Sequence, residues 1–133
     1  MFWSRKISPK DLARAESELK IQLPADYAAA LLKNPFKGGA QEFYGNLDEI
    51  LNQTKWNRDE GFFGLKWPEN YLVIGDDGAG NQYFIDLNRT PSPVFFVDHE
   101  IAAVKDKWEV TEEAASVKQW IQRLPQLWKE MDG

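Results

Sequence analysis

The residues best suited to chemistry lie in two short clusters in the second half of the chain. The first is Gly75-Asp76-Asp77-Gly78-Ala79-Gly80-Asn81, and the second is Asp98-His99-Glu100, which contains the only histidine of the protein. A carboxylate beside an imidazole can orient it as a general base, and several carboxylates with a histidine can bind a divalent metal. Both clusters therefore need comparison with the patterns that such chemistry requires.

The glycine-rich segment fits neither of the loops that bind cations or phosphates. An EF-hand loop needs oxygen ligands at alternating positions, and after Asp76 these positions hold Gly78 and Gly80. The glycines do not form a G-x-G-x-x-G or Walker A motif, and a strand is predicted where a phosphate loop needs a helix. The composition instead predicts the tip of a β-hairpin, because glycine tolerates positive φ. An acidic tip of this kind can serve as a recognition surface.

No complete catalytic or metal-binding set is evident. The chain has no cysteine, which excludes thiol nucleophiles, disulfides and zinc thiolate sites, and no serine lies in a G-x-S-x-G context. A metal-dependent hydrolase would need the acids of the hairpin to converge on Asp98-His99-Glu100. Because nothing in the sequence demonstrates that convergence, we predict no catalytic residue, no metal site and no cofactor. The hydrolase stays as an alternative that metal-binding measurements can test.

Length and composition describe one globular domain with an acidic balance. The 133 residues are 43% hydrophobic and 14% aromatic, and 16 Lys and Arg stand against 21 Asp and Glu, for a net charge of −5. The acidic excess lies after residue 37, since residues 1–37 alone are net basic. An acidic domain binds phosphate backbones poorly, so we do not expect nucleic acid as a partner.

The chain also lacks the apolar segments that membranes or secretion require. Its first residues do not form the apolar run of a signal peptide. The longest aliphatic run, residues 28–32, is far too short to cross a bilayer. We therefore expect a cytoplasmic protein with no membrane partner.

Capping residues and apolar periodicity predict helices in the first half and at the end of the chain. Ser8 caps a helix over about 9–20, Pro24 opens a second that runs to Lys33, and Asn46 caps a third over about 47–56. Residues 57–69 are predicted to be a loop. Ser116 caps a final helix, which we expect Pro125 to end.

The middle of the chain changes to the alternating pattern of strands. Residues 71–74, 82–87 and 94–97 are predicted to form an antiparallel meander, with a further short strand near 108–110. Helices precede and follow these strands. The predicted fold class is therefore α+β: a single domain with an antiparallel sheet (central meander about 71–98) and helices packed mainly on one face.

Three groups of residues together resemble a known family. They are Ile21-x-Leu23-Pro24-x-Asp26-Tyr27 with Leu31-Leu32 and Gly38-Gly39, then Ile74 to Asn81 running into Phe84-Ile85-Asp86-Leu87, and last Pro93 to Glu100. Their order and spacing are similar to those of the SUKH superfamily, specifically its Smi/Knr cell-wall-assembly regulator group. The resemblance covers about residues 8–124, within one domain of residues 1–133.

The resemblance implies a compact α+β domain without established catalysis. It implies that bacterial members are immunity proteins of polymorphic and contact-dependent toxin systems. Such proteins bind a cognate toxin domain, often a nuclease, and block it. It implies that fungal members are regulators and scaffolds, so an intracellular scaffold of the same fold is the alternative.

The charge pattern supports a basic protein partner. From Gly75 to Glu100 there are five acids and one base, Arg89. An acidic surface associates rapidly with the basic cleft of a nuclease, and aromatic side chains beside it supply apolar anchors. Any tryptophan that the fold leaves exposed would be a further anchor. The predicted contact residues are Trp67, Asp76, Asp77, Tyr83, Asp86, Asp98, His99 and Glu100.

Overall fold

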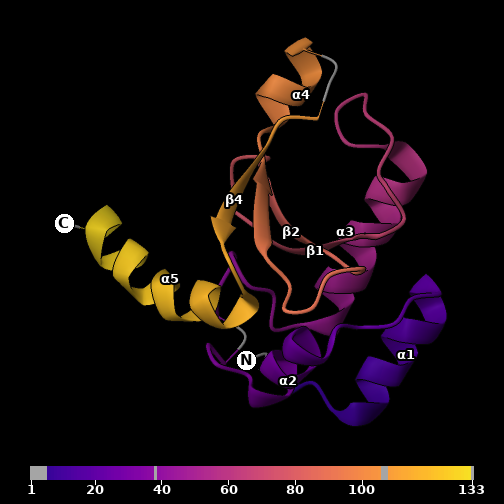
Figure 1. Ribbon diagram of the computed structural model, residues 1–133, viewed down its shortest axis with the longest axis vertical. Coiled ribbons are helices and arrows are strands. Elements are labelled where there is room, and N and C mark those ends of the chain that lie inside the picture. Colours follow the sequence, from indigo (N-terminus) through magenta and orange to yellow (C-terminus); the bar gives the residue numbers. More distant parts are fainter. Residues whose placement is uncertain (1–5, 38, 106–107, 133) are drawn as a thin grey trace, which may run out of the picture.

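The computed structural model describes residues 6–37, 39–105 and 108–132 (Figure 1). Three helices precede a meander of strands, and two further helices flank the last strand, so the predicted α+β class is confirmed. In chain order the elements are α1 (Pro9–Leu19), α2 (Ala25–Lys33), α3 (Leu47–Glu60), β1 (Tyr71–Asp76), β2 (Gln82–Asp86), β3 (Val94–Val97), α4 (His99–Lys105), β4 (Val110–Ala114) and α5 (Val117–Asp132).

The starts of the first three helices follow their capping residues. Ser8 and Asp11 form a capping box, in which the Ser8 N–H donates to Asp11 Oδ2 at 2.9 Å. Asn46 caps α3 by accepting hydrogen bonds from the N–H groups of Asp48 and Glu49. Pro24 is the N-cap of α2 and not its first helical residue.

The ends of α3 and α5 differ from the prediction because tertiary contacts extend both helices. Helix α3 continues to Glu60, and Asn57, predicted to start a loop, is 1% exposed and hydrogen-bonded to Gln82 of β2 at 2.5 Å. Helix α5 continues through Pro125 to Asp132. Beyond the proline, Trp128 packs edge-on against Phe36, with ring centroids 5.1 Å apart, and this packing offsets the lost backbone hydrogen bond.

The four strands form one antiparallel sheet in the order β1-β2-β3-β4. The fourth strand spans Val110–Ala114, so the strand predicted near 108–110 was placed too early; its position follows from pairing with β3, where Val97 pairs with Val110. Strand β3 has its predicted limits, residues 94–97. A short helix that the sequence did not predict follows it, because Asp98 Oδ1 accepts from the N–H groups of Glu100 and Ile101 and so caps α4.

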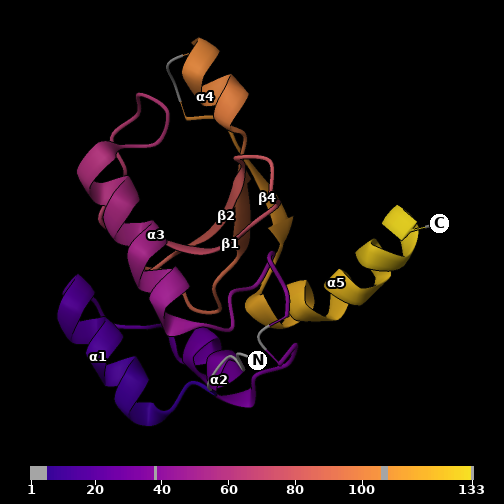
Figure 2. The ribbon, with the colours of Figure 1, turned by 180° about the vertical axis from the view of Figure 1, so that it is seen from behind.

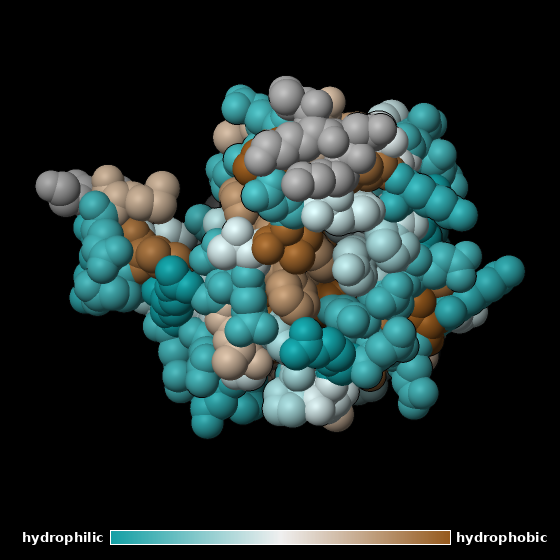
Figure 3. All heavy atoms as spheres, turned by 45° about the horizontal axis from the view of Figure 1, so that its top comes forward, coloured by the Kyte–Doolittle hydropathy of each residue, from teal (hydrophilic) through white to brown (hydrophobic). Residues whose placement is uncertain are grey.

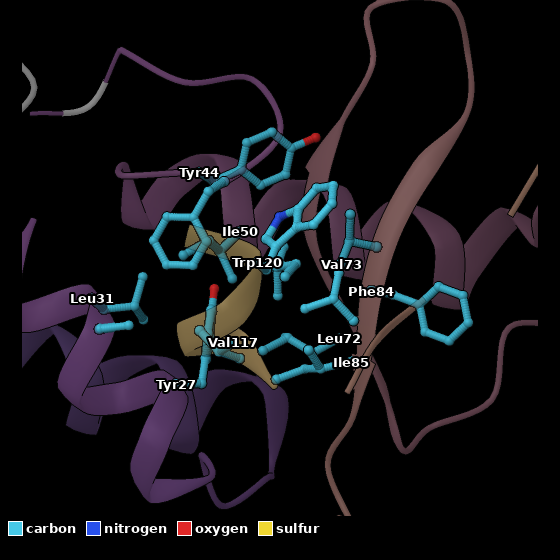
Figure 4. Close-up of a cluster of buried hydrophobic side chains, with 14 of the residues drawn as sticks. Tyr27, Leu31, Tyr44, Ile50, Leu72, Val73, Phe84, Ile85, Val117 and Trp120 are labelled. Atoms are coloured by element: carbon cyan, nitrogen blue, oxygen red, sulfur yellow. The ribbon is translucent and has the colours of Figure 1, made fainter. Parts of the chain in front are cut away.

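The main core fills the space between the sheet and three helices. Figure 4 shows side chains of α2, α3 and α5 meeting Leu72 and Ile85 on one side of the sheet, whereas Phe84 points to the other side. Tyr27 is fully buried there, and Trp120 of α5 is 1% exposed. The predicted placement of helices mainly on one face is thus confirmed.

Aromatic side chains cover the opposite side of the sheet. Phe84 stacks on Tyr71 with a centroid distance of 4.4 Å, and Trp67 meets it edge-on at 5.5 Å. Trp108 packs against Trp67 at 5.6 Å. This second cluster lies on loop and strand residues and needs no helix. None of the described helices is long and apolar enough to cross a bilayer.

Candidate functional site

The two hairpin aspartates hold the turn that connects β1 to β2. Asp76 Oδ1 accepts from the Gly78 N–H at 2.8 Å, and its Oδ2 accepts from the Tyr44 hydroxyl at 2.6 Å. Asp77 Oδ1 accepts from the N–H of Ala79 at 2.9 Å and from that of Asn81 at 3.2 Å. Their carboxylates are therefore fixed in place by the backbone of the tip, while their negative charge stays at this end of the molecule.

Asn81 links the hairpin tip to the start of α4. Its Nδ2 donates to Asp77 Oδ2 at 2.8 Å, and its Oδ1 accepts from the backbone N–H of His99 at 2.9 Å. The same Oδ1 lies 2.7 Å from His99 Nδ1. Because an amide oxygen only accepts hydrogen bonds, Nδ1 of His99 must carry a proton and donate a hydrogen bond to Asn81. Nε2 is the ring nitrogen that Asn81 does not engage. His99 is thus a positioned side chain that joins two segments.

Glycine is required where the hairpin meets this histidine. Gly80 has φ of +96°, and a Cβ added there would lie 3.0 Å from His99 Nδ1. The ring of His99 also packs against Phe63, with centroids 4.9 Å apart. The loop after α3, the hairpin tip and the start of α4 therefore meet around one imidazole.

A hollow of about 480 Å³ opens beside this junction, between the C-terminal half of α3 and the hairpin. Trp56 and Phe63 line it and are 62% and 50% exposed. Glu60 adds a carboxylate to its wall, and the hydrogen-bonded pair Asn57 and Gln82 lies at its base. A neighbouring hollow of about 240 Å³ shares Gln53, Gly80 and Gln82 with it and reaches Asp76.

Figure 3 turns this end of the molecule toward the reader. Apolar atoms lie in the middle of the face, within a surface that is mostly hydrophilic. Exposed aromatic side chains beside carboxylates form a surface that suits the side chains of Arg and Lys, whose stems are apolar and whose ends are cationic. We call this region the hairpin-end surface: Trp56, Glu60, Phe63, Asp76, Asp77, Asp98, His99 and Glu100.

The structure brings five of the eight predicted contact residues to this end. Asp76 and Asp77 form the hairpin tip, and Asp98, His99 and Glu100 follow β3, whose end is paired with the start of β2. Asp86 lies at the opposite end of β2, where its Oδ1 accepts from Asn70 Nδ2 and the Asn88 N–H.

The two aromatic residues predicted as anchors have other positions. Trp67 is 2% exposed, and its Nε1 donates to the carbonyl of Tyr71 at 2.8 Å, so it belongs to the second aromatic cluster. Tyr83 is half-buried between Phe96 and Trp120, and burial raises its pKa to about 12. Trp56 and Phe63 occupy the place that Trp67 and Tyr83 were expected to take. A signal for Trp56 existed, because it lies off the apolar face that Leu47, Ile50, Leu51 and Thr54 define.

The geometry gives no support to the hydrolase alternative. Within residues 6–37, 39–105 and 108–132, no three histidine or acidic side chains converge so as to hold a metal ion. His99 Nδ1 is engaged by an amide and not by a carboxylate that would orient it as a base. What the arrangement can do chemically is recognise a partner by charge and aromatic contact.

The comparison with protein families agrees with the fold. The model of the SMI1 / KNR4 family (SUKH-1) matches residues 6–123, which is most of the chain. The chain belongs to this family. Neither the curated proteins nor the solved structures gave a match. The match to this SUKH-1 model confirms the resemblance that the sequence motifs carried. Its range runs from α1 into the first half of α5 and thus includes the whole hairpin-end surface.

Proposed function

We propose that this SUKH-1 domain is a non-enzymatic binding protein, an immunity protein that binds and neutralises a cognate bacterial toxin domain with a basic surface, such as a nuclease. One observation carries the proposal. Two exposed aromatic side chains, Trp56 and Phe63, stand beside a hollow at the end of the molecule where four carboxylates of the hairpin and of the start of α4 gather. The family assignment is consistent with an immunity-protein-like or regulatory binding domain.

The physical basis for neutralisation is occupancy of a basic cleft. A nuclease needs cationic groups to hold a phosphate backbone, and carboxylates placed in that cleft compete for the same groups. Aromatic anchors supply much of the affinity once the surfaces meet, because exclusion of water around a large flat side chain concentrates binding energy there. Charge brings the partners together quickly and the aromatics keep them together.

Co-expression tests the proposal directly. The probe is the C-terminal domain of the protein encoded beside this gene, with growth rescue and pull-down as readouts. Trp56→Ala is expected to weaken binding about 30-fold, the effect of losing an interfacial hot spot of about 2 kcal/mol. Met131→Ala is the matched control, because Met131 is 78% exposed and lies on α5, away from the hairpin-end surface. Equal binding of the two variants would place the interface elsewhere.

The alternatives predict different results in the same experiments. A scaffold or regulator would be recovered with a stable partner that is harmless when expressed alone. A hydrolase would bind Mg²⁺, Mn²⁺, Ca²⁺ or Zn²⁺ in calorimetry at millimolar concentration. Absence of both growth rescue and binding for the neighbouring domain would remove the immunity function.

A further inference from the structure

The two edges of the sheet differ, and other segments of the chain cover the β1 edge. Along the outer side of β1, the Tyr71 carbonyl accepts from Trp67, the Val73 N–H donates to Thr54 Oγ1 at 3.1 Å, and the Ile74 carbonyl accepts from the Tyr44 N–H at 2.7 Å. The Asp76 N–H donates to the Gln41 carbonyl at 2.8 Å. Successive outward groups of β1 thus have partners in the loop before α3, in α3 and in the loop before β1.

The same observation fixes which groups of β4 face outward. In an antiparallel sheet, alternate residues of a strand direct their backbone groups to opposite sides. The backbone groups of Val73 are directed away from β2, so those of its neighbour Leu72 are directed toward β2 and bond the paired Ile85. The same alternation carried across the sheet makes Phe84 bond Phe95, and Phe96 bond Thr111. Thr111 therefore bonds to β3. Val110 and Glu112 direct their N–H and C=O groups to the outer side of β4.

These outward groups are accessible. Val110 is 41% exposed, and Thr111 and Glu112 are exposed as well. Within the described parts of the chain, no hydrogen bond reaches the outward backbone groups of Val110 or Glu112. Figures 1 and 2 show β4 as the outermost strand, with α5 leaving from its end and no other labelled helix or strand along its outer side.

Charge identifies the kind of strand that this edge accepts. The segment Val110–Ala114 carries two glutamates, Glu112 and Glu113, and no basic residue. The carboxylate of Glu113 is paired with Arg123 of α5 at 3.5 Å, which leaves Glu112 as the acid that an added strand meets. A second copy pairing with β4 would bring two such glutamates together, and like charges across strands are destabilising. A segment with Lys or Arg at alternate positions would place its cations near Glu112. The same carboxylate that discourages self-association thus favours a basic strand.

The edge also lies close to the hairpin-end surface. Gln82, Val97 and Val110 are paired across β2, β3 and β4, so β4 begins in the row of residues that contains the first residue of β2. A partner on the hairpin end needs to cross only two strands to reach Val110. Exposure of Val110 gives the added segment an apolar contact in the same place.

We propose that the free edge of β4 receives an extended basic segment of the partner as a fifth strand of the sheet, held by the backbone groups of Val110 and Glu112. This mode of binding, β-strand addition, uses main-chain hydrogen bonds for affinity and side-chain charge for selection. The inference rests on the proposed protein-binding function and adds the way in which part of the partner is held.

Proline at Val110 tests the proposal, because the one backbone group that it removes is an N–H that points outward. Proline is tolerated at such a position of an edge strand, whereas the N–H of Thr111 is needed for the bond to β3. Val110→Ala is the matched control, since it also removes the valine side chain but keeps the N–H. With the C-terminal domain encoded by the neighbouring gene as the probe, V110P is expected to bind at least tenfold more weakly than V110A, with both variants matched by thermal unfolding.

Amide hydrogen exchange supplies a second measurement on the unmodified protein, which does not depend on the proline variant folding. The amides of Val110 and Glu112 are expected to exchange rapidly in the free domain and to become protected in the complex. Equal affinity of V110P and V110A, or rapid exchange of both amides in the complex, overturns the inference and leaves the proposed function standing. Protection that depends on the concentration of the domain alone means self-association and also overturns it. If the unmodified domain fails to bind the probe, the proposed function fails and the inference fails with it.

Discussion

The β1 and β4 edges of the sheet differ in how their backbone groups are satisfied. Along β1, outward N–H and C=O groups bond to Thr54 of α3, to Trp67 and to the backbone of the Gln41–Tyr44 segment. Along β4, the outward groups of Val110 and Glu112 remain accessible beside exposed side chains. An uncovered edge invites pairing with other chains, so proteins usually protect it. Among the described residues, other segments cover the β1 edge, whereas the β4 edge carries the charge of Glu112, the bulge at Glu113 and the contact of Arg123 with the Glu113 carbonyl.

The largest effect is expected where the covered edge is tightest. A Cβ added at Gly75 would lie 2.3 Å from the carbonyl carbon and oxygen of Glu42, so Gly75→Ala must push the covering segment away from β1. We expect a loss of about 3 kcal/mol in the free energy of unfolding, measured by urea denaturation. Gly64→Ala is the control, because nothing lies near its added Cβ, and its cost of about 1 kcal/mol comes from the positive φ alone. A smaller loss at Gly75 than at Gly64 would contradict the tight fit.

A matched pair of threonines compares the two edges directly. Thr54 is fully buried and its hydroxyl accepts from the Val73 N–H, so Thr54→Val leaves that N–H buried without a partner and should cost about 2 kcal/mol. Thr111 is exposed on β4, and Thr111→Val should change stability by less than about 0.5 kcal/mol. Urea denaturation of both variants measures the difference. Similar losses of unfolding free energy in the two variants would mean that the hydrogen bond from the Val73 N–H to the Thr54 hydroxyl does not make the β1 edge different from the β4 edge.

Alkaline pH should weaken the covered edge through Tyr44. Burial raises the pKa of Tyr44 above its ordinary value, and the hydrogen bond to Asp76 raises it further. The unfolded chain ionises near pH 10 and the folded chain does not, so the contribution of Tyr44 to stability is complete below pH 10 and is lost as pH rises above it. Tyr44→Phe is therefore expected to reduce the fall in the urea midpoint between pH 9 and pH 11. The pH dependence of the urea midpoint that remains in the variant is expected from Tyr27 and Tyr83, whose pKa values are also raised by burial. If the urea midpoint of the variant falls as steeply between pH 9 and pH 11 as that of the unmodified protein, Tyr44 does not contribute to the loss of stability at alkaline pH.

The smallest effect concerns the charge at the free edge. Glu112→Gln should leave stability nearly unchanged and slow the association with a basic partner about threefold at low salt, since a charge at the rim of an interface acts mainly on the association rate. Glu130→Gln on exposed α5 is the control for net charge. Stopped-flow or surface-binding kinetics at two salt concentrations measure the rates. If both variants associate with the partner at equal rates, carboxylates other than Glu112 attract it to this edge.

Local signals predicted those elements whose limits are set by nearby residues. The capping box of Ser8 and Asp11 predicted the start of α1, and the continuous apolar run from Val94 to Val97 predicted β3 with its observed limits. The ends of α3 and α5 were not predictable in this way. Asn57 is held in the helix by Gln82, and the turns after Pro125 are held by contacts of Trp128 with Phe36 and Glu42, all of which are distant in the chain.

The candidate site shows the same division between local and tertiary information. Asp76 and His99 could be grouped from the sequence because a meander brings the start of β2 and the end of β3 together. Asp86 could be separated from them only from the length of β2, because β2 ends at Asp86 and so places it at the other end of the strand from the hairpin tip. Trp67 and Trp56 have the same chemistry, and only the packing of the second aromatic cluster decides that Trp67 is buried while Trp56 meets solvent.

The covering of β1 has a consequence for the time course of folding. The pairs of β1 with β2 and of β2 with β3 join neighbours in the chain, so the meander can form through short loops, whereas the bonds to Gln41, Tyr44 and Thr54 close much longer ones. Until α3 and the Gln41–Tyr44 segment dock, the nascent sheet has two open edges in place of one. Chains are therefore most prone to pair with one another through these edges in that interval. A variant that delays docking, such as Thr54→Val, should aggregate during refolding at concentrations where the native domain does not.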